Sequence, residues 1–257
     1  MGNFTVLWVG QVFSLIGSAI TGFAVGIWAW EETGLATPLA LVGVFSVIPM
    51  LLLTPPAGVI VDKWPRKLVL AFSDIFSGLG TLFVLVMYLT GQLQIWHIYL
   101  AAAMVGIGAA FQWPAYSAAI SVMLPKQHYA RANGMISMAD SGAGILAPTL
   151  AAALYAGVGL KGILILDLAA LALALALLVV ARIPSREPQP ESGPVKSFLR
   201  QMTFGFRYIW ERKPLLGVQT TFLFINLFFG ISGAIMVPML MSRTNNNVTL
   251  LGTIQSI

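Results

Sequence analysis

The sequence predicts an all-α membrane protein that crosses the lipid bilayer several times. Of its 257 residues, 58% are hydrophobic and only 9% are charged, whereas a soluble globular domain carries roughly a quarter charged residues. The mean hydropathy is accordingly high, at +0.87. A soluble fold with so few charged residues would have almost nothing to face water, so lipid must solvate most of the chain.

Seven apolar stretches are long enough to be membrane-spanning helices. A helix needs about 20 predominantly apolar residues to cross the roughly 30 Å hydrocarbon layer. We expect spans at Phe4–Trp30, Leu39–Val61, Leu68–Leu89, Trp96–Leu124, Ala132–Val158, Gly162–Ala181 and Leu215–Met241. Turn-forming and charged residues separate these stretches, and the break at 157–161 divides the fifth span from the sixth.

The spans divide the chain into three parts. Residues 1–182 are expected to form a six-helix bundle, residues 183–213 a cytoplasmic linker, and residues 214–257 the start of a second bundle. The last apolar run, Val248–Ile257, would cover only about 15 Å of the bilayer. We therefore expect this sequence to be part of a longer protein, with one helix and a fragment of its second bundle.

Within the linker, Val195–Trp210 has the pattern of an amphipathic helix. Apolar residues recur there at helical spacing, namely Phe198, Met202, Phe206 and Ile209. Basic residues lie between them, which is typical of a helix that rests on the inner membrane surface. An ordinary solvated linker helix is the alternative.

The basic residues gather on one side of the predicted membrane. The loops after the second, fourth and sixth spans hold every Lys and Arg except Lys161 and Arg243. Cytoplasmic loops are enriched in these residues, so we expect the N-terminus and the three loops to be cytoplasmic, in a bacterial inner membrane. The topology and the anionic inner leaflet account for the net charge of +5 without a nucleic-acid partner.

The sequence lacks the patterns that catalysis or cofactor binding requires. There is no cysteine, and the two histidines, His97 and His128, are too isolated to form a metal site. No Walker phosphate loop, G-x-S-x-G or H-E-x-x-H motif occurs. We expect a non-enzymatic protein without metal or cofactor, whose partners are the bilayer and a small molecule.

The loop between the second and third spans carries an ordered set of small, acidic and basic residues: Gly58, Asp62, Arg66 and Lys67. This set resembles the loop signature of the major facilitator superfamily, with Pro65 in place of a glycine. The resemblance implies a cytoplasmic gate, in which Gly58 permits close approach of helices and Arg66 and Lys67 hold the cytoplasmic face. An ordinary basic cytoplasmic loop is the alternative.

A second motif lies in the fifth span, where Gly144 and Pro148 are accompanied by small residues, Ala147, Ala151 and Ala152. It resembles the antiporter signature of the same superfamily, with alanines in place of glycines. Small residues and a proline produce a bent helix that packs closely on its neighbour. Generic small-residue packing explains the pattern equally well.

Several short stretches resemble the macrolide-efflux branch of that superfamily. They are Leu7–Ser14, Glu32–Gly34, Phe111–Ala115 and Arg131–Gly134. The resemblance implies twelve helices in two six-helix halves, a central cavity that opens alternately to either side, and export driven by proton exchange. This chain would then lack most of the C-terminal half.

Three acids, Asp74, Asp140 and Asp167, lie inside predicted spans, where a charge is costly and commonly functional. Asp140 is about 13 Å deep, near the midplane, and no Lys or Arg lies within any span. It is our candidate proton carrier. A structural acid bonded to Ser137 or Ser141 is the alternative.

The other acids are expected nearer the ends of their helices. Asp74 lies roughly 9 Å from the cytoplasmic end of its span, and we expect it to join the gate around Asp62 and Arg66. Asp167 and the pair Glu31–Glu32 are expected at the extracellular rim.

Polar and aromatic residues on the first and fourth spans are candidates for the wall of a substrate cavity: Gln11, Ser14, Ser18, Gln112, Trp113 and Tyr116. Residues three or four apart share one face of a helix. Such stripes line a water-filled path or hydrogen-bond between helices, and aromatic rings can stack on a bulky hydrophobic or cationic molecule.

These observations favour a secondary active exporter of a hydrophobic or amphipathic small molecule, coupled to protons. Two alternatives stay open at this point. One is an importer or facilitator with the same fold, since direction is not encoded in the fold. The other is a membrane subunit or inactive half that does not transport by itself.

Overall fold

The computed structural model describes residues 1–184, 205, 207–244 and 254. Long helices account for nearly all of them: α1 (Gly2–Thr33), α2 (Ala36–Lys63), α3 (Arg66–Leu89), α4 (Ile95–Met123), α5 (Tyr129–Val180) and α7 (Lys213–Arg243), with a short 3₁₀ turn, η1 (Lys126–His128). The described residues contain no strand. The predicted all-α class is confirmed, and each long helix is apolar and long enough to cross a membrane.

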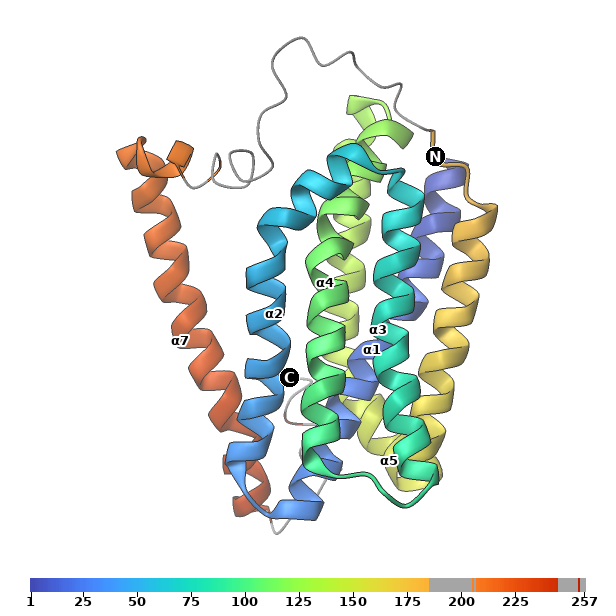
Figure 1. The fold of residues 1–257 in the computed structure, drawn as a ribbon, viewed down its shortest axis with the longest axis vertical. Coiled ribbons are helices and arrows are strands. Elements are labelled where there is room, and N and C mark those ends of the chain that lie inside the picture. The colour runs from blue at the N-terminus through green and yellow to red at the C-terminus, as the bar shows by residue number, and fades with distance from the viewer. Residues whose placement is uncertain (185–204, 206, 245–253, 255–257) are drawn as a thin grey trace.

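The helix α5 consists of two antiparallel arms, 129–158 and 160–180, that meet at Gly159 (Figure 1). Gly159 has φ 65° and ψ −177°, a conformation that a side chain would make costly. The reversal lies within the break predicted at 157–161. With α1 to α4, the two arms complete a bundle of six spans.

Successive connections between the helices lie at alternate ends of the bundle, as the predicted spans require. Figure 1 shows the N-terminus, the α2–α3 loop, the α4–α5 connection and the end of α5 at one end of the molecule. The α1–α2 and α3–α4 loops and the turn at Gly159 lie at the opposite end. The basic loops therefore share one end of the bundle, which we call the N-terminal end.

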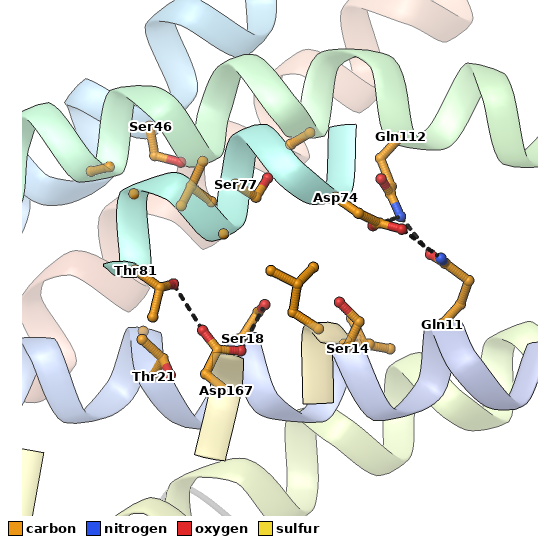
Figure 2. A pocket seen from close by; sticks show the side chains of 18 of the residues that line it. Gln11, Ser14, Ser18, Thr21, Ser46, Asp74, Ser77, Thr81, Gln112 and Asp167 are labelled. Atoms are coloured by element: carbon orange, nitrogen blue, oxygen red, sulfur yellow. Dashed lines mark hydrogen bonds between the residues drawn. The ribbon is translucent and has the colours of Figure 1, made fainter. Parts of the chain in front are cut away.

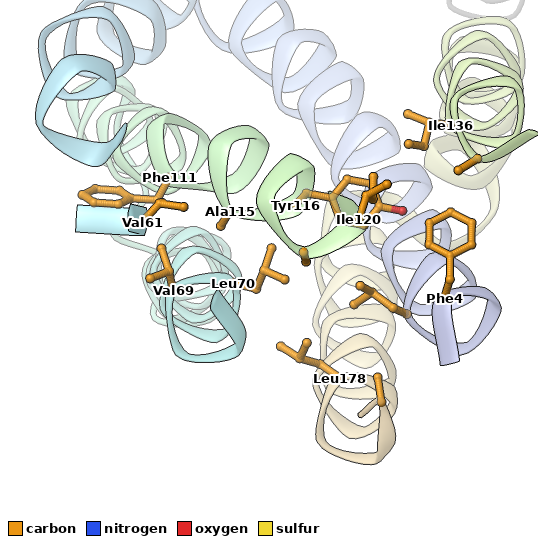
Figure 3. Packing of buried hydrophobic residues seen from close by; sticks show 14 of the residues in the cluster. Phe4, Val61, Val69, Leu70, Phe111, Ala115, Tyr116, Ile120, Ile136 and Leu178 are labelled. Carbon is orange, nitrogen blue, oxygen red and sulfur yellow. The ribbon is translucent and has the colours of Figure 1, made fainter. Parts of the chain in front are cut away.

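Two apolar clusters fill the interior near its two ends. The N-terminal cluster joins α1, α3, α4 and both arms of α5 through Phe4, Leu70, Ile120, Ile136 and Leu178 (Figure 3). The distal cluster includes Ile20, Trp28, Val84, Ile98 and Leu164. Along α1, the stretch between these clusters is the one that carries the polar residues from Gln11 to Ser18.

Small residues let the helices approach closely, as lipid-embedded helices require. A Cβ added to Gly106 of α4 would overlap the backbone carbonyl of Ser46 on α2. A Cβ on Gly108, also on α4, would lie 2.7 Å from the Ser73 carbonyl on α3. On α1, a Cβ at Gly10 would lie 3.3 Å from Ala174. These glycines therefore set the spacing of three helix pairs.

Outside the bundle, α7 contacts α2 near the distal end and is otherwise largely exposed (Figure 1). It contains the predicted seventh span. Most of the predicted amphipathic helix and of the final half-span lies outside the described residues. Just before α7, Arg207 pairs with Glu211 at 2.7 Å, and the Arg212 guanidinium lies 3.5 Å above the Tyr208 ring.

Candidate functional site

A partly open cavity of about 620 Å³ lies in the bundle between the two apolar clusters. All five bundle helices, including both arms of α5, contribute to its wall. The volume lies within the range of roughly 300–1,000 Å³ that is typical of sites for drug-sized ligands. Most of the lining is apolar, and the polar residues are concentrated on α1, α3 and α4.

Polar side chains from α1 and α3 face each other across this cavity (Figure 2). On α1 they recur every three or four residues, at Gln11, Ser14, Ser18 and Thr21. On α3 they follow the same spacing, at Asp74, Ser77 and Thr81. Helical geometry places each series on one face of its helix. The cavity therefore carries a polar track parallel to the helices.

All six residues chosen from sequence as cavity candidates line this cavity: Gln11, Ser14, Ser18, Gln112, Trp113 and Tyr116. Their predicted role in binding remains to be tested. The Trp113 side chain is 60% exposed, whereas Tyr116 is buried. Within the described part of the chain, the buried Tyr116 hydroxyl has no hydrogen-bond partner.

Asp74 is held by two glutamines at one end of the polar track. The amide nitrogen of Gln11 donates to its Oδ2 at 3.1 Å, and that of Gln112 donates to its Oδ1 at 3.0 Å (Figure 2). Ser73 in turn donates to the Gln112 amide oxygen. The network joins α1, α3 and α4, and only 4% of Asp74 is exposed.

This position differs from the one expected from sequence. We expected Asp74 to join the gate around Asp62 and Arg66, but its carboxylate bonds to cavity residues instead. The reason is its helical face: Asp74 shares the cavity side of α3 with Ser77 and Thr81.

Asp167 lies toward the other end of the track. Thr81 donates to its Oδ2 at 2.9 Å and Ser18 to its Oδ1 at 3.4 Å (Figure 2). A Cβ at Gly17 would come 2.8 Å from Oδ1, so α1 approaches this carboxylate closely. Asp167 is only 5% exposed. The expected place at the extracellular rim is wrong, because the acid points inward between α1 and α3.

Asp140 lies on the cavity wall but is exposed, unlike the other two acids. Among the described residues, it has no hydrogen bond to Ser137 or Ser141, the partners that a purely structural role would use. The predicted proton carrier is thus an accessible carboxylate at the open side of the cavity. Its role is not tested by this geometry.

The loop motif at the N-terminal end contributes contacts of a different kind. The Lys67 ammonium donates to the carbonyls of Val179 at 2.6 Å and Ala181 at 3.2 Å. It thereby caps the last turn of α5, where carbonyls have no partner within the helix. Arg66 is buried, and its Nε has no partner in the described part of the chain. Asp62 is exposed.

Two glycines of these motifs, Gly58 and Gly144, do not lie at a close contact between helices of this bundle. A Cβ on Gly58 or on Gly144 would meet no atom within 4 Å among the described residues. Within this bundle Gly58 faces open space, and its role in a close helix approach stays a prediction. In the fifth span, by contrast, Pro148, Ala147 and Ala151 are buried, so only part of that motif packs as expected.

Replacing Lys67 with methionine is expected to destabilise the protein by about 1 kcal/mol. This is below the usual value for a hydrogen bond to a charged group, because Lys67 is only partly buried. The thermal midpoint in detergent should fall by about 2–4 °C. Lys63→Met, at an exposed position of the same loop, serves as the control. Equal effects of the two substitutions would show that the α5 cap adds no stability.

Secondary transporters place their substrate sites near the bilayer midplane, within a bundle of membrane-spanning helices. The Major Facilitator Superfamily profile matches residues 7–256, nearly the whole chain. The chain belongs to this family of transporters. Both the predicted family and the predicted non-enzymatic character are confirmed. Among the described residues, no group of three His, Cys, Asp or Glu side chains could hold a metal ion.

Bacterial efflux proteins are among the relatives. The chain is 28% identical over 227 residues to macrolide efflux protein A of Streptococcus pyogenes, covering 87% of this chain and 56% of that protein. Macrolide efflux protein A of Enterococcus faecalis is 26% identical over 182 residues, covering 69% and 56%. The chain thus spans about half the length of the curated relatives it matches.

The fold is similar to that of a solved transporter. A bacterial homologue of the human lysosomal transporter Spinster, in an inward-facing and unoccupied conformation, superimposes with a TM-score of 0.68. The match covers 98% of this chain and 58% of that chain, at 17% identity. The likeness shows the major facilitator fold.

Proposed function

We propose that this chain supplies the N-terminal half of a proton-coupled exporter of a hydrophobic or amphipathic small molecule. The observation that carries the proposal is the cavity of about 620 Å³, which collects carboxylates, amides and aromatic rings inside an apolar bundle. A membrane protein maintains such costly polar groups within its spans chiefly where a substrate or an ion passes. The efflux relatives support the outward direction.

The residues divide into three roles in this proposal. Trp113 and Tyr116 contact the substrate through their rings, which line the cavity. Asp140 exchanges protons at the accessible edge of the cavity. Asp62 and Arg66 belong to the gate at the N-terminal end, which we place on the cytoplasmic side of the inner membrane because the basic loops lie there.

The position of the cavity between two apolar clusters supports alternating access. The N-terminal cluster closes the interior toward one side of the membrane, and the distal cluster closes it toward the other. A second six-helix half would complete the cavity and move against this bundle, as the internal repeats of such transporters do. We propose that transport requires this second half.

The test measures transport by the protein purified from the cells that naturally produce it. Reconstituted in inverted orientation, the exporter should accumulate a labelled macrolide when the vesicle interior is acidic. Accumulation should stop when an ionophore collapses the proton gradient. Accumulation that is indifferent to the gradient would contradict proton coupling, and uptake only in the opposite orientation would favour an importer. Vesicles without the protein provide the background.

A further inference from the structure

The charged groups of the cavity wall all have the same sign. Asp74, Asp140 and Asp167 line the cavity, and none of the described lining residues is Lys, Arg or His. A carboxylate in a low-dielectric interior is costly unless a positive charge or hydrogen bonds compensate it. No described lining side chain supplies that positive charge, and a cationic ligand in the cavity would supply it.

The three acids differ in how far their environment satisfies them. Asp167 receives hydroxyl hydrogen bonds where α1 and α5 pack closely, so it mainly joins helices. Asp140 is exposed, where water weakens its attraction for a ligand charge. Asp74 is almost fully buried and yet lines the cavity, so water screens its charge from a ligand less than it screens the charge of Asp140.

The partners of Asp74 orient it without neutralising it. Each of its oxygens accepts one hydrogen bond from a neutral glutamine amide, from Gln11 or Gln112. A carboxylate oxygen has two lone-pair directions, so each oxygen retains capacity for a ligand. The glutamines therefore fix a carboxylate that is ready to receive a cation from the cavity side.

We propose that the cavity selects an amphipathic organic cation, and that Asp74 is the residue that recognises its positive charge. This inference rests on the proposed function and names the substrate class of that site. The rings of Trp8, Trp113 and Tyr116 line the same cavity and attract a cation through their faces. A neutral ligand leaves Asp74 uncompensated, and an anionic ligand is repelled by all three acids.

The test compares three probes of similar size and shape on the purified protein in lipid nanodiscs. Tetraphenylphosphonium is permanently cationic, triphenylphosphine oxide is neutral, and tetraphenylborate is anionic. Equilibrium dialysis against empty nanodiscs corrects for partition into lipid. We expect the cation to bind at least tenfold more tightly than the neutral probe, and the anion not to bind above the lipid background.

Asp74→Asn removes the charge while keeping the shape of the side chain. It should weaken binding of the cation roughly 30-fold, the lower end of the loss when one partner of a buried charge pair is removed. Binding of the neutral probe should change less than twofold, which also verifies the fold. Glu32→Gln removes the same charge at an exposed site outside the cavity and should leave both affinities unchanged.

Two results would overturn the inference. One is an unmodified protein that binds the neutral probe as tightly as the cation, a comparison that needs no variant. The other is an Asp74→Asn protein that still prefers the cation. Since the assay measures binding alone, cation selectivity without proton-driven export would refute the proposed function only. Export of neutral compounds with no cation preference would refute only this inference.

Discussion

Replacing Asp140 with asparagine is expected to abolish proton-coupled export while the protein remains folded. The side chain is exposed on the cavity wall and has no hydrogen-bond partner among the described residues, so its loss breaks no internal contact. An amide of the same shape cannot take up and release a proton. Coupled transport should fall roughly 100-fold, the lower end of the effect of removing a proton-transfer group.

The measurement is substrate-driven proton movement into liposomes that contain a pH-sensitive dye. Asp140→Glu restores an ionisable group and should recover part of the flux, and Glu32→Gln provides a charge control away from the cavity. Unchanged proton flux in Asp140→Asn would assign the proton to another carboxylate. Asp74 and Asp167, the two buried acids of the same cavity, would then be the next candidates.

Adding a single methyl group at Gly106 is expected to destabilise the bundle, by about 1–3 kcal/mol or more. The new Cβ of Gly106→Ala would overlap the Ser46 backbone carbonyl, and backbone cannot rotate away as a side chain can. The helices α2 and α4 would have to separate. The midpoint of thermal unfolding, followed by tryptophan fluorescence in detergent, and the monodisperse fraction should both fall.

Gly43→Ala is the matched control for this substitution. Gly43 lies in the helix α2, is exposed, and has no atom within 4 Å of an added Cβ in the described part of the chain. Alanine is a better helix former than glycine by about 1 kcal/mol, so this change should be neutral or stabilising. The same added methyl group is thus expected to lower the stability at Gly106 and to leave it unchanged or raise it at Gly43. Equal effects would mean that the spacing of α2 and α4 is not limited at Gly106.

The spans were predictable because hydropathy and turn residues act locally along the chain. The break at 157–161 identified the reversal at Gly159, and the basic loops lie together at one end of the bundle. The polar stripe on α1 was also recognisable from its spacing. These features depend on helix length and periodicity, which a single sequence carries.

The positions of the buried acids were not predictable from depth alone. Depth along a span does not state which face of the helix turns inward, and that depends on neighbours distant in sequence. For Asp167 these neighbours are Ser18 and Thr81. The α3 series of Asp74, Ser77 and Thr81 was a readable signal, because polar residues at helical spacing mark one face.

The cap that Lys67 places on α5 has a mechanical consequence. It fastens the loop at the start of α3 to the point where the chain leaves the bundle, at Ala181. The loop and the exit of the chain are therefore coupled, because a shift of either one lengthens these hydrogen bonds. A movement of the start of α3 is thereby felt at the end of α5, where the chain leaves the bundle.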